Sequence, residues 1–120
     1  DQDLNTLWWS FVERFQMVKK PPHRDAPDWA AKIHVALYPV YYHNYLLGEL
    51  FASQLHNHIV HTVLQLENDA AVSYVDAKDV GTFLSQNIFE PGSKAYWNEM
   101  IENATGEPLS ARFFVEQFVQ

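Results

Sequence analysis

The sequence contains no cysteine, so disulfide bonds and thiolate metal sites are both excluded. No apolar run approaches the roughly 20 residues that a membrane-spanning helix needs. Basic residues are few, at 8 Lys and Arg against 15 Asp and Glu, which gives a formal net charge of -7. Because a nucleic-acid backbone is bound by a basic stripe, this balance argues against a nucleic-acid partner. The composition therefore favours a protein that neither spans a membrane nor binds nucleic acid.

The sequence also lacks the short motifs that mark several classes of hydrolase. It has no G-x-S-x-G elbow, no glycine-rich phosphate loop and no H-E-x-x-H zinc helix. His56, His58 and His61 lie near one another, but no carboxylate at a suitable spacing completes a metal-ligand set with them. Their pattern is typical of the polar face of a long helix. We therefore expect no metal site within this chain.

The chain is rich in apolar and aromatic residues. Of its 120 residues, 48% are hydrophobic and 15% are Phe, Trp or Tyr, which argues against disorder. This length suits one domain, and we expect residues 1–120 to form a single α-helical domain. A monomer seldom exposes large apolar patches, and a chain of this size has a limited core in which to bury so many aromatic residues. Some of it is therefore expected to contact polypeptide outside this chain, or a second copy through self-association.

Apolar residues recur with helical spacing along most of the chain. Candidate N-caps are Asp3 or Asn5, Asp28, Asp76, Ser93 and Ser110, and Gly106 is a candidate C-terminal stop. A loop is expected at Glu67-Asn68-Asp69, and Val72–Val75 is the one strand-like run. The expected helices cover about residues 3–18, 38–66, 77–89, 93–103 and the stretch after 110, with a short turn near 29–32.

The longest expected helix runs from about Tyr38 to Leu66, with Pro39 in its first turn. It is apolar on most sides near its start, which is typical of a helix that others surround. Residues three or four apart share a helix face, so Tyr42 and Tyr45 would line one side, which Tyr38 and Glu49 extend by one turn each. The sequence thus predicts an all-α fold with four to five helices around one long central helix.

Lys32-Ile33-His34-Val35 and Tyr42–Tyr45 are two of several ordered motifs that extend over nearly the whole chain. These motifs resemble angiotensin-converting enzyme and related peptidyl-dipeptidases: the first is similar to that family's Lys-Phe-His-Val, and the second to its Tyr-Ile-Arg-Tyr after a one-residue insertion. Further matches are Trp8-Trp9, Phe15-Gln16, Pro21-Pro22, Gln54-Leu55-His56, Gly92-Ser93, Trp97, Glu99 and Gly106. Thimet oligopeptidase and oligoendopeptidase F are more distantly similar, through Tyr45-Leu46 and Glu49-Leu50-Phe51.

The resemblance implies the C-terminal fragment of a larger helical, gluzincin-type zinc peptidase that hydrolyses peptides. His34 and Tyr45 would donate hydrogen bonds to the oxyanion of the tetrahedral intermediate. Lys32 and Tyr42 would hold the free C-terminal carboxylate of the peptide substrate, and the insertion makes Tyr41 an alternative to Tyr42. The zinc ligands would lie on the N-terminal remainder of the same peptidase, so this fragment is expected to bind no zinc and to be inert alone.

A second interpretation also fits the sequence. A helical module without catalysis could use the same apolar cleft and Lys32 to bind a peptide or a partner protein. An H-E-x-x-H motif upstream in the same gene would favour the peptidase, because the chain itself has no such motif.

Overall fold

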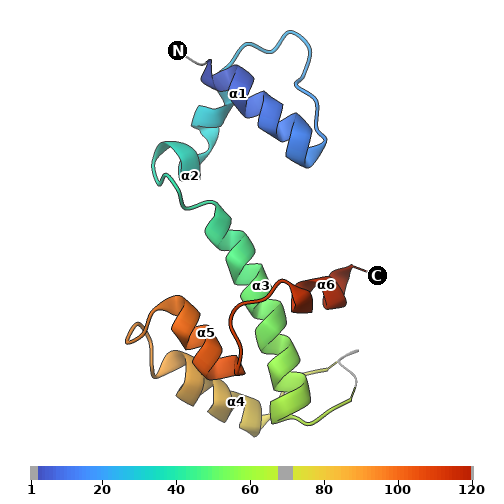
Figure 1. The fold of residues 1–120 in the computed structure, drawn as a ribbon, viewed down its shortest axis with the longest axis vertical. Helices are drawn as coiled ribbons and strands as arrows, with labels where there is room; N and C mark the ends of the chain where they lie inside the picture. The colour runs from blue at the N-terminus through green and yellow to red at the C-terminus, as the bar shows by residue number, and fades with distance from the viewer. Residues whose placement is uncertain (1–2, 68–71, 120) are drawn as a thin grey trace. The chain divides into compact units, whose positions relative to one another are not determined.

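The structure, a computed structural model, describes residues 3–67 and 72–119. Within these residues it contains helices and no strand, which confirms the all-α class (Figure 1). The expected loop residues Asn68 and Asp69 lie outside the described ranges, and the strand-like run Val72–Val75 is not a strand. The chain divides into two compact units, Asp1–Asn44 and Tyr45–Gln120, which are called unit N and unit C below. No helix of the described residues is long and apolar enough to cross a bilayer.

Unit N begins with a helix that Asp3 caps, as predicted. Its side chain accepts hydrogen bonds from the backbone N–H groups of Asn5 (3.1 Å) and Thr6 (3.2 Å). These groups have no acceptor within the helix, so the cap stabilises its first turn. The helix consists of α1 (Leu4–Phe11) and a π-helical turn η1 (Val12–Gln16). Two short elements follow, the 3₁₀ helix η2 (Asp28–Ala31) and the α-helix α2 (Ile33–Ala36).

Asp28 does not cap the turn that follows it, contrary to the prediction. Its carboxylate instead accepts hydrogen bonds from Arg24 Nε (2.8 Å) and from the indole N–H of Trp9 (3.0 Å). The acceptor oxygens are thus already engaged by a cation and an indole from earlier in the chain. This bond set ties the connector before η2 to helix α1. The hydrogen bond from Arg24, and then that from Trp9, lower the pKa of Asp28 below its ordinary value of 3.8.

Acidification is expected to loosen unit N through Asp28. A carboxyl group whose pKa is lower in the folded state stabilises the fold above its unfolded pKa, and this stabilisation is lost as pH falls through the folded value. Tryptophan fluorescence during urea unfolding, followed from neutral pH to about pH 3, measures the loss. Asp28→Asn is expected to lower stability at neutral pH and to flatten this profile. Asp25→Asn, at an exposed position of the same connector, is the matched control. An unchanged profile for Asp28→Asn would contradict the account.

The long helix begins later than predicted. Helix α3 covers His43–His58 and continues through the π-helical segment η3 (Ile59–Val63), whereas Tyr38–Tyr42 lie in the turn before it. Pro39 disfavours helical geometry at Tyr38, and Val40 has a φ of 60°, in the left-handed region. A helix cannot run through this turn. Tyr38 and Tyr42 therefore do not share a helix face with Tyr45.

Unit C packs three shorter helices near α3 and η3 (Figure 1). They are α4 (Lys78–Leu84) with its π-helical extension η4 (Ser85–Phe89), α5 (Trp97–Thr105) and α6 (Arg112–Phe118). Gly106 ends α5 with a φ of 84°, as predicted, because a glycine adopts this left-handed geometry without steric cost. The buried apolar core of unit C is formed by Ile59, Val60, Val80, Ile101, Ala104 and Phe113.

Two predicted caps in unit C are wrong. Asp76 and Ser93 make no cap, since the residues that precede α4 and α5 are Ala77 and Tyr96, without side-chain cap bonds. Asp76 has a φ of 61° in the turn before α4. Ser110 lies one residue before the cap position of α6, but its hydroxyl still accepts a hydrogen bond from the backbone N–H of Arg112 (3.2 Å).

Gln54 is the main polar link inside unit C. Its side chain is 1% exposed and lies in the middle of α3. Its amide nitrogen donates to the Thr105 hydroxyl (2.8 Å) and to the carbonyls of Glu107 (3.0 Å) and Pro108 (3.3 Å), and its amide oxygen accepts from the Ser110 N–H (2.9 Å). The connector between α5 and α6 is therefore fastened to α3 by one side chain. These backbone groups of the connector make no hydrogen bonds within a helix or sheet. Gln54 therefore takes the place of the water that they would otherwise bind.

Candidate functional site

The imidazole of His34 is the centre of an aromatic cluster in unit N. His34 lies on α2 and is half-buried. Its ring centroid is 5.6 Å from that of Tyr41, 5.7 Å from that of Tyr42 and 6.5 Å from that of Tyr38. The Tyr42 ring meets the imidazole edge-on, at an interplanar angle of 64°. The turn at Pro39 and Val40 thus brings three phenols around one imidazole.

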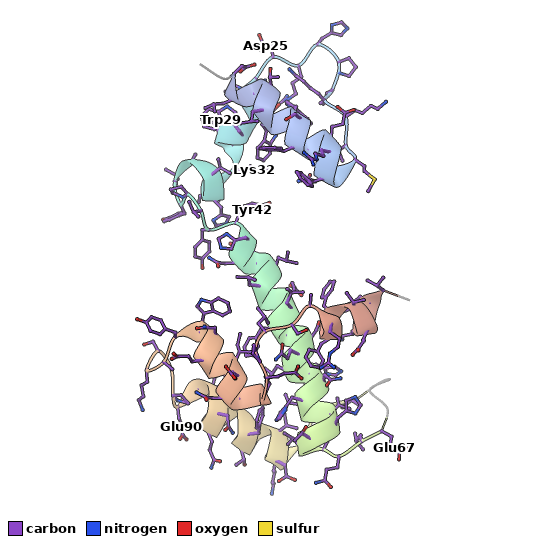
Figure 2. All side chains as sticks on the ribbon, viewed as in Figure 1. Asp25, Trp29, Lys32, Tyr42, Glu67 and Glu90 are labelled. Atoms are coloured by element: carbon purple, nitrogen blue, oxygen red, sulfur yellow. The ribbon has the colours of Figure 1, made fainter. Side chains whose placement is uncertain are left out.

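Lys32 and Tyr42 lie before and after α2 in this cluster region (Figure 2). Lys32 is the residue before α2, and its backbone carbonyl accepts hydrogen bonds from the N–H groups of Val35 (2.9 Å) and Ala36 (3.0 Å). Its side chain is exposed, and Tyr41 and Tyr42 are 50% and 56% exposed. An ammonium and phenol hydroxyls that reach solvent can bind a carboxylate through charge-assisted and neutral hydrogen bonds.

Tyr45 belongs to unit C, in the first turns of α3, and its side chain is exposed. The predicted site residues therefore fall into two groups. His34, Tyr41 and Tyr42 are in mutual proximity within unit N, with Lys32 close in sequence. Tyr38, which the sequence reasoning did not select for the site, joins the same cluster; its spacing of four residues from His34 was the available signal.

His56, His58 and His61, which lie close together in the sequence, each contact a different residue of unit C. His58 packs its ring against Phe83 of α4, with centroids 5.2 Å apart. His56 Nδ1 is hydrogen-bonded to the Tyr74 hydroxyl, and His61 Nδ1 to the Leu66 carbonyl at 2.8 Å. Burial raises the pKa of Tyr74. Among the described residues, no three His, Asp or Glu side chains are grouped so that they could hold a metal ion.

A comparison with known protein families covers most of the chain. The family model described as carboxypeptidase Taq (M32) metallopeptidase matches residues 35–120, which is more than half of the chain. The match includes Tyr41, Tyr42 and Tyr45 and all of unit C. The searches of curated proteins and of solved structures gave no match.

Proposed function

Because the chain belongs to the carboxypeptidase Taq (M32) metallopeptidase family, we propose that it is the C-terminal, substrate-binding portion of a zinc-dependent peptidase. The family match supports a metallopeptidase, as the resemblance in the sequence implied, and it points to a carboxypeptidase family rather than to the converting enzyme itself. The observation that carries the proposal is the cluster of His34 with Tyr41 and Tyr42, within a chain of this family.

In this proposal Lys32 holds the C-terminal carboxylate of a peptide, with Tyr42 or Tyr41 as the second donor. An ammonium–carboxylate hydrogen bond is about twice as strong as a neutral one, so Lys32 would dominate the binding of this group. The turn at Pro39 and Val40 supports the role, because it holds both phenols beside α2 without requiring them to be helical. A fixed carboxylate anchor sets how far from the chain end the peptide is cut.

His34 and Tyr45 would stabilise negative charge on the carbonyl oxygen during hydrolysis. Both side chains can donate one hydrogen bond to an oxyanion. The aromatic rings around His34 would fix the orientation of the imidazole before the substrate arrives, which is the condition under which such donors are most effective.

The described residues do not provide a site for the zinc that this family uses. The described residues offer no group of three suitable ligands, so the metal would be held by other polypeptide of the intact enzyme. The part of this chain would be to bind and orient the peptide and to supply hydrogen-bond donors. Its exposed apolar side chains, such as Leu37 at 71% and Val40 at 86%, would contact that other polypeptide.

Activity measurements on two proteins test the proposal. The intact product of the gene is expected to hydrolyse a peptide with a free C-terminus, and a chelator should stop the reaction. The 120-residue chain alone is expected to hydrolyse nothing. Stoichiometric zinc and chelator-sensitive hydrolysis by the isolated chain would contradict the proposal.

The masses of the products distinguish two modes of cleavage. The name of the matched family favours release of one C-terminal residue, whereas the converting-enzyme motifs favour release of a dipeptide. An oligopeptidase would cut within the peptide and tolerate a blocked C-terminus. We propose the first mode, and mass spectrometry after partial digestion measures it.

A non-catalytic peptide- or protein-binding module is the second candidate. One observation favours it, an apolar groove of about 240 Å³ in unit N that is lined by Leu4, Leu7, Trp8, Phe11, Trp29 and Val35. Such a groove suits an apolar side chain of a partner. An intact gene product without peptidase activity would favour this module over the enzyme.

A further inference from the structure

Tyr38 has no part in the proposed function so far, yet its ring neighbours that of His34 within unit N. The two ring centroids are 6.5 Å apart, at an interplanar angle of 44°. This separation is within the range over which aromatic rings attract each other. Residues four apart along a helical turn bring their side chains together, and His34 and Tyr38 have this spacing. The contact therefore belongs to the C-terminal end of α2.

The backbone fixes Tyr38 at this end of α2. The carbonyl of Ile33 accepts hydrogen bonds from the N–H groups of both Leu37 and Tyr38, each at 2.9 Å. Pro39 comes next in the chain and limits the backbone angles open to Tyr38. The place of the Tyr38 ring beside the imidazole is thus set by residues that precede the turn bringing in the other two phenols.

The orientation of the His34 imidazole decides which of its atoms a substrate can meet. Nδ1 is buried, so a hydrogen bond from the ring to a substrate has to come from Nε2. The torsion that turns the ring about the Cβ–Cγ bond is broad and roughly two-fold. A half-turn about this bond places carbon where each nitrogen was, and the donor would be lost from its position. An aromatic ring packed beside the imidazole opposes this half-turn.

We propose that Tyr38 is a positioning residue, which holds the His34 imidazole in the orientation that presents Nε2 to the substrate. The inference rests on the proposed function, in which His34 donates to the oxyanion. Ring packing needs an aromatic side chain and no hydroxyl, so phenylalanine should replace Tyr38 and alanine should not. Tyr38 is 61% exposed, so either substitution leaves the buried core intact.

NMR of the full 120-residue chain measures the orientation of the imidazole. In the wild type, the Cδ2 and Cε1 protons of His34 should show different nuclear Overhauser effects to the rings of Tyr41 and Tyr42. Tyr38→Phe should keep this pattern, whereas in Tyr38→Ala the two protons should show similar effects because the ring turns over. Leu37→Ala, at the neighbouring exposed position, is the matched control and should keep the wild-type pattern. An unchanged pattern in Tyr38→Ala would overturn the inference, whether or not the gene product is a peptidase.

Kinetics of the intact enzyme test whether the orientation serves hydrolysis. Tyr38→Ala is expected to lower kcat about two- to tenfold, the factor that corresponds to one aromatic contact. KM should change little, because the donor acts mainly in the transition state. The loss should be smaller than in His34→Ala, which removes the donor itself. Tyr38→Phe should have the wild-type kcat, which a role of the hydroxyl would not allow.

The outcomes separate this inference from the proposed function. A wild-type kcat in Tyr38→Ala beside a low kcat in His34→Ala would overturn the role of Tyr38 and leave the proposed function in place. Absence of hydrolysis by the intact wild type would overturn the proposed function and with it the catalytic importance of Tyr38. The nuclear Overhauser effects would then still decide whether Tyr38 holds the imidazole.

Discussion

Replacing Gln54 with leucine is expected to destabilise unit C by about 1–3 kcal/mol, the usual cost of a buried polar group left without a partner. The substitution would remove the acceptor of the Ser110 N–H and the donor to the Pro108 carbonyl, whereas the Glu107 carbonyl would keep its hydrogen bond from the Thr105 hydroxyl (3.1 Å). Leucine is close to glutamine in size, so a cavity would contribute little to the loss. The effect would report hydrogen bonding specifically.

The measurement is urea unfolding followed by far-ultraviolet circular dichroism. Gln86→Leu, at an exposed position of η4, is the matched control and should change stability by less than about 0.5 kcal/mol. Gln54→Glu separates charge from shape. It keeps the side-chain length but buries a carboxylate beside acceptors, so its stability should recover on acidification. Equal stability of Gln54→Leu and Gln86→Leu at neutral pH would show that Gln54 does not hold the connector.

Removing the proposed oxyanion donors is expected to give the largest effect on activity. In the intact peptidase, Tyr45→Phe and His34→Ala should each lower kcat about 10²–10³-fold, the usual loss for one preorganised donor. KM should change much less, because such hydrogen bonds are stronger in the transition state than with bound substrate. Initial rates with a free-acid peptide measure both constants.

Tyr96→Phe is the control for this experiment. Tyr96 is 78% exposed, is the residue before α5 and does not belong to the cluster around His34. Loss of the Tyr96 hydroxyl should leave kcat unchanged. A Tyr45→Phe enzyme as active as Tyr96→Phe would remove Tyr45 from the proposed mechanism, whatever the result for His34.

Local signals in the sequence were sufficient for part of the fold. The helical spacing of apolar residues predicted an all-α chain, and Asp3 and Gly106 were correctly assigned to helix ends. These features depend on neighbours within a few residues. The start of the long helix was misjudged because a proline such as Pro39 occurs both in the first turn of a helix and where a helix is interrupted. The left-handed Val40, which decides between the two, has no clear sequence signature.

Long-range partners could not be read from local patterns. Asp28 is a good cap by residue type, yet Arg24 and Trp9 engage its carboxylate instead. Gln54 was noted only as part of a motif, although it binds groups more than fifty positions away along the chain.

The candidate site was predicted in part. His34, Tyr41 and Tyr42 were selected by resemblance, and the structure places their rings together. Tyr38 was not selected because no matching motif includes it, whereas the turn brings its ring to 6.5 Å from that of His34. The roles of all five residues, Lys32, His34, Tyr41, Tyr42 and Tyr45, stay predictions.

The most direct test of the account compares one peptide as its free acid and as its C-terminal amide, using the intact enzyme and its Lys32→Met variant. The wild type should prefer the acid, and Lys32→Met should lower kcat/KM for the acid about tenfold or more, while the amide is hardly affected. The preference for the acid would then largely vanish. An unchanged preference in Lys32→Met would contradict the claim that this segment holds the carboxylate of the substrate.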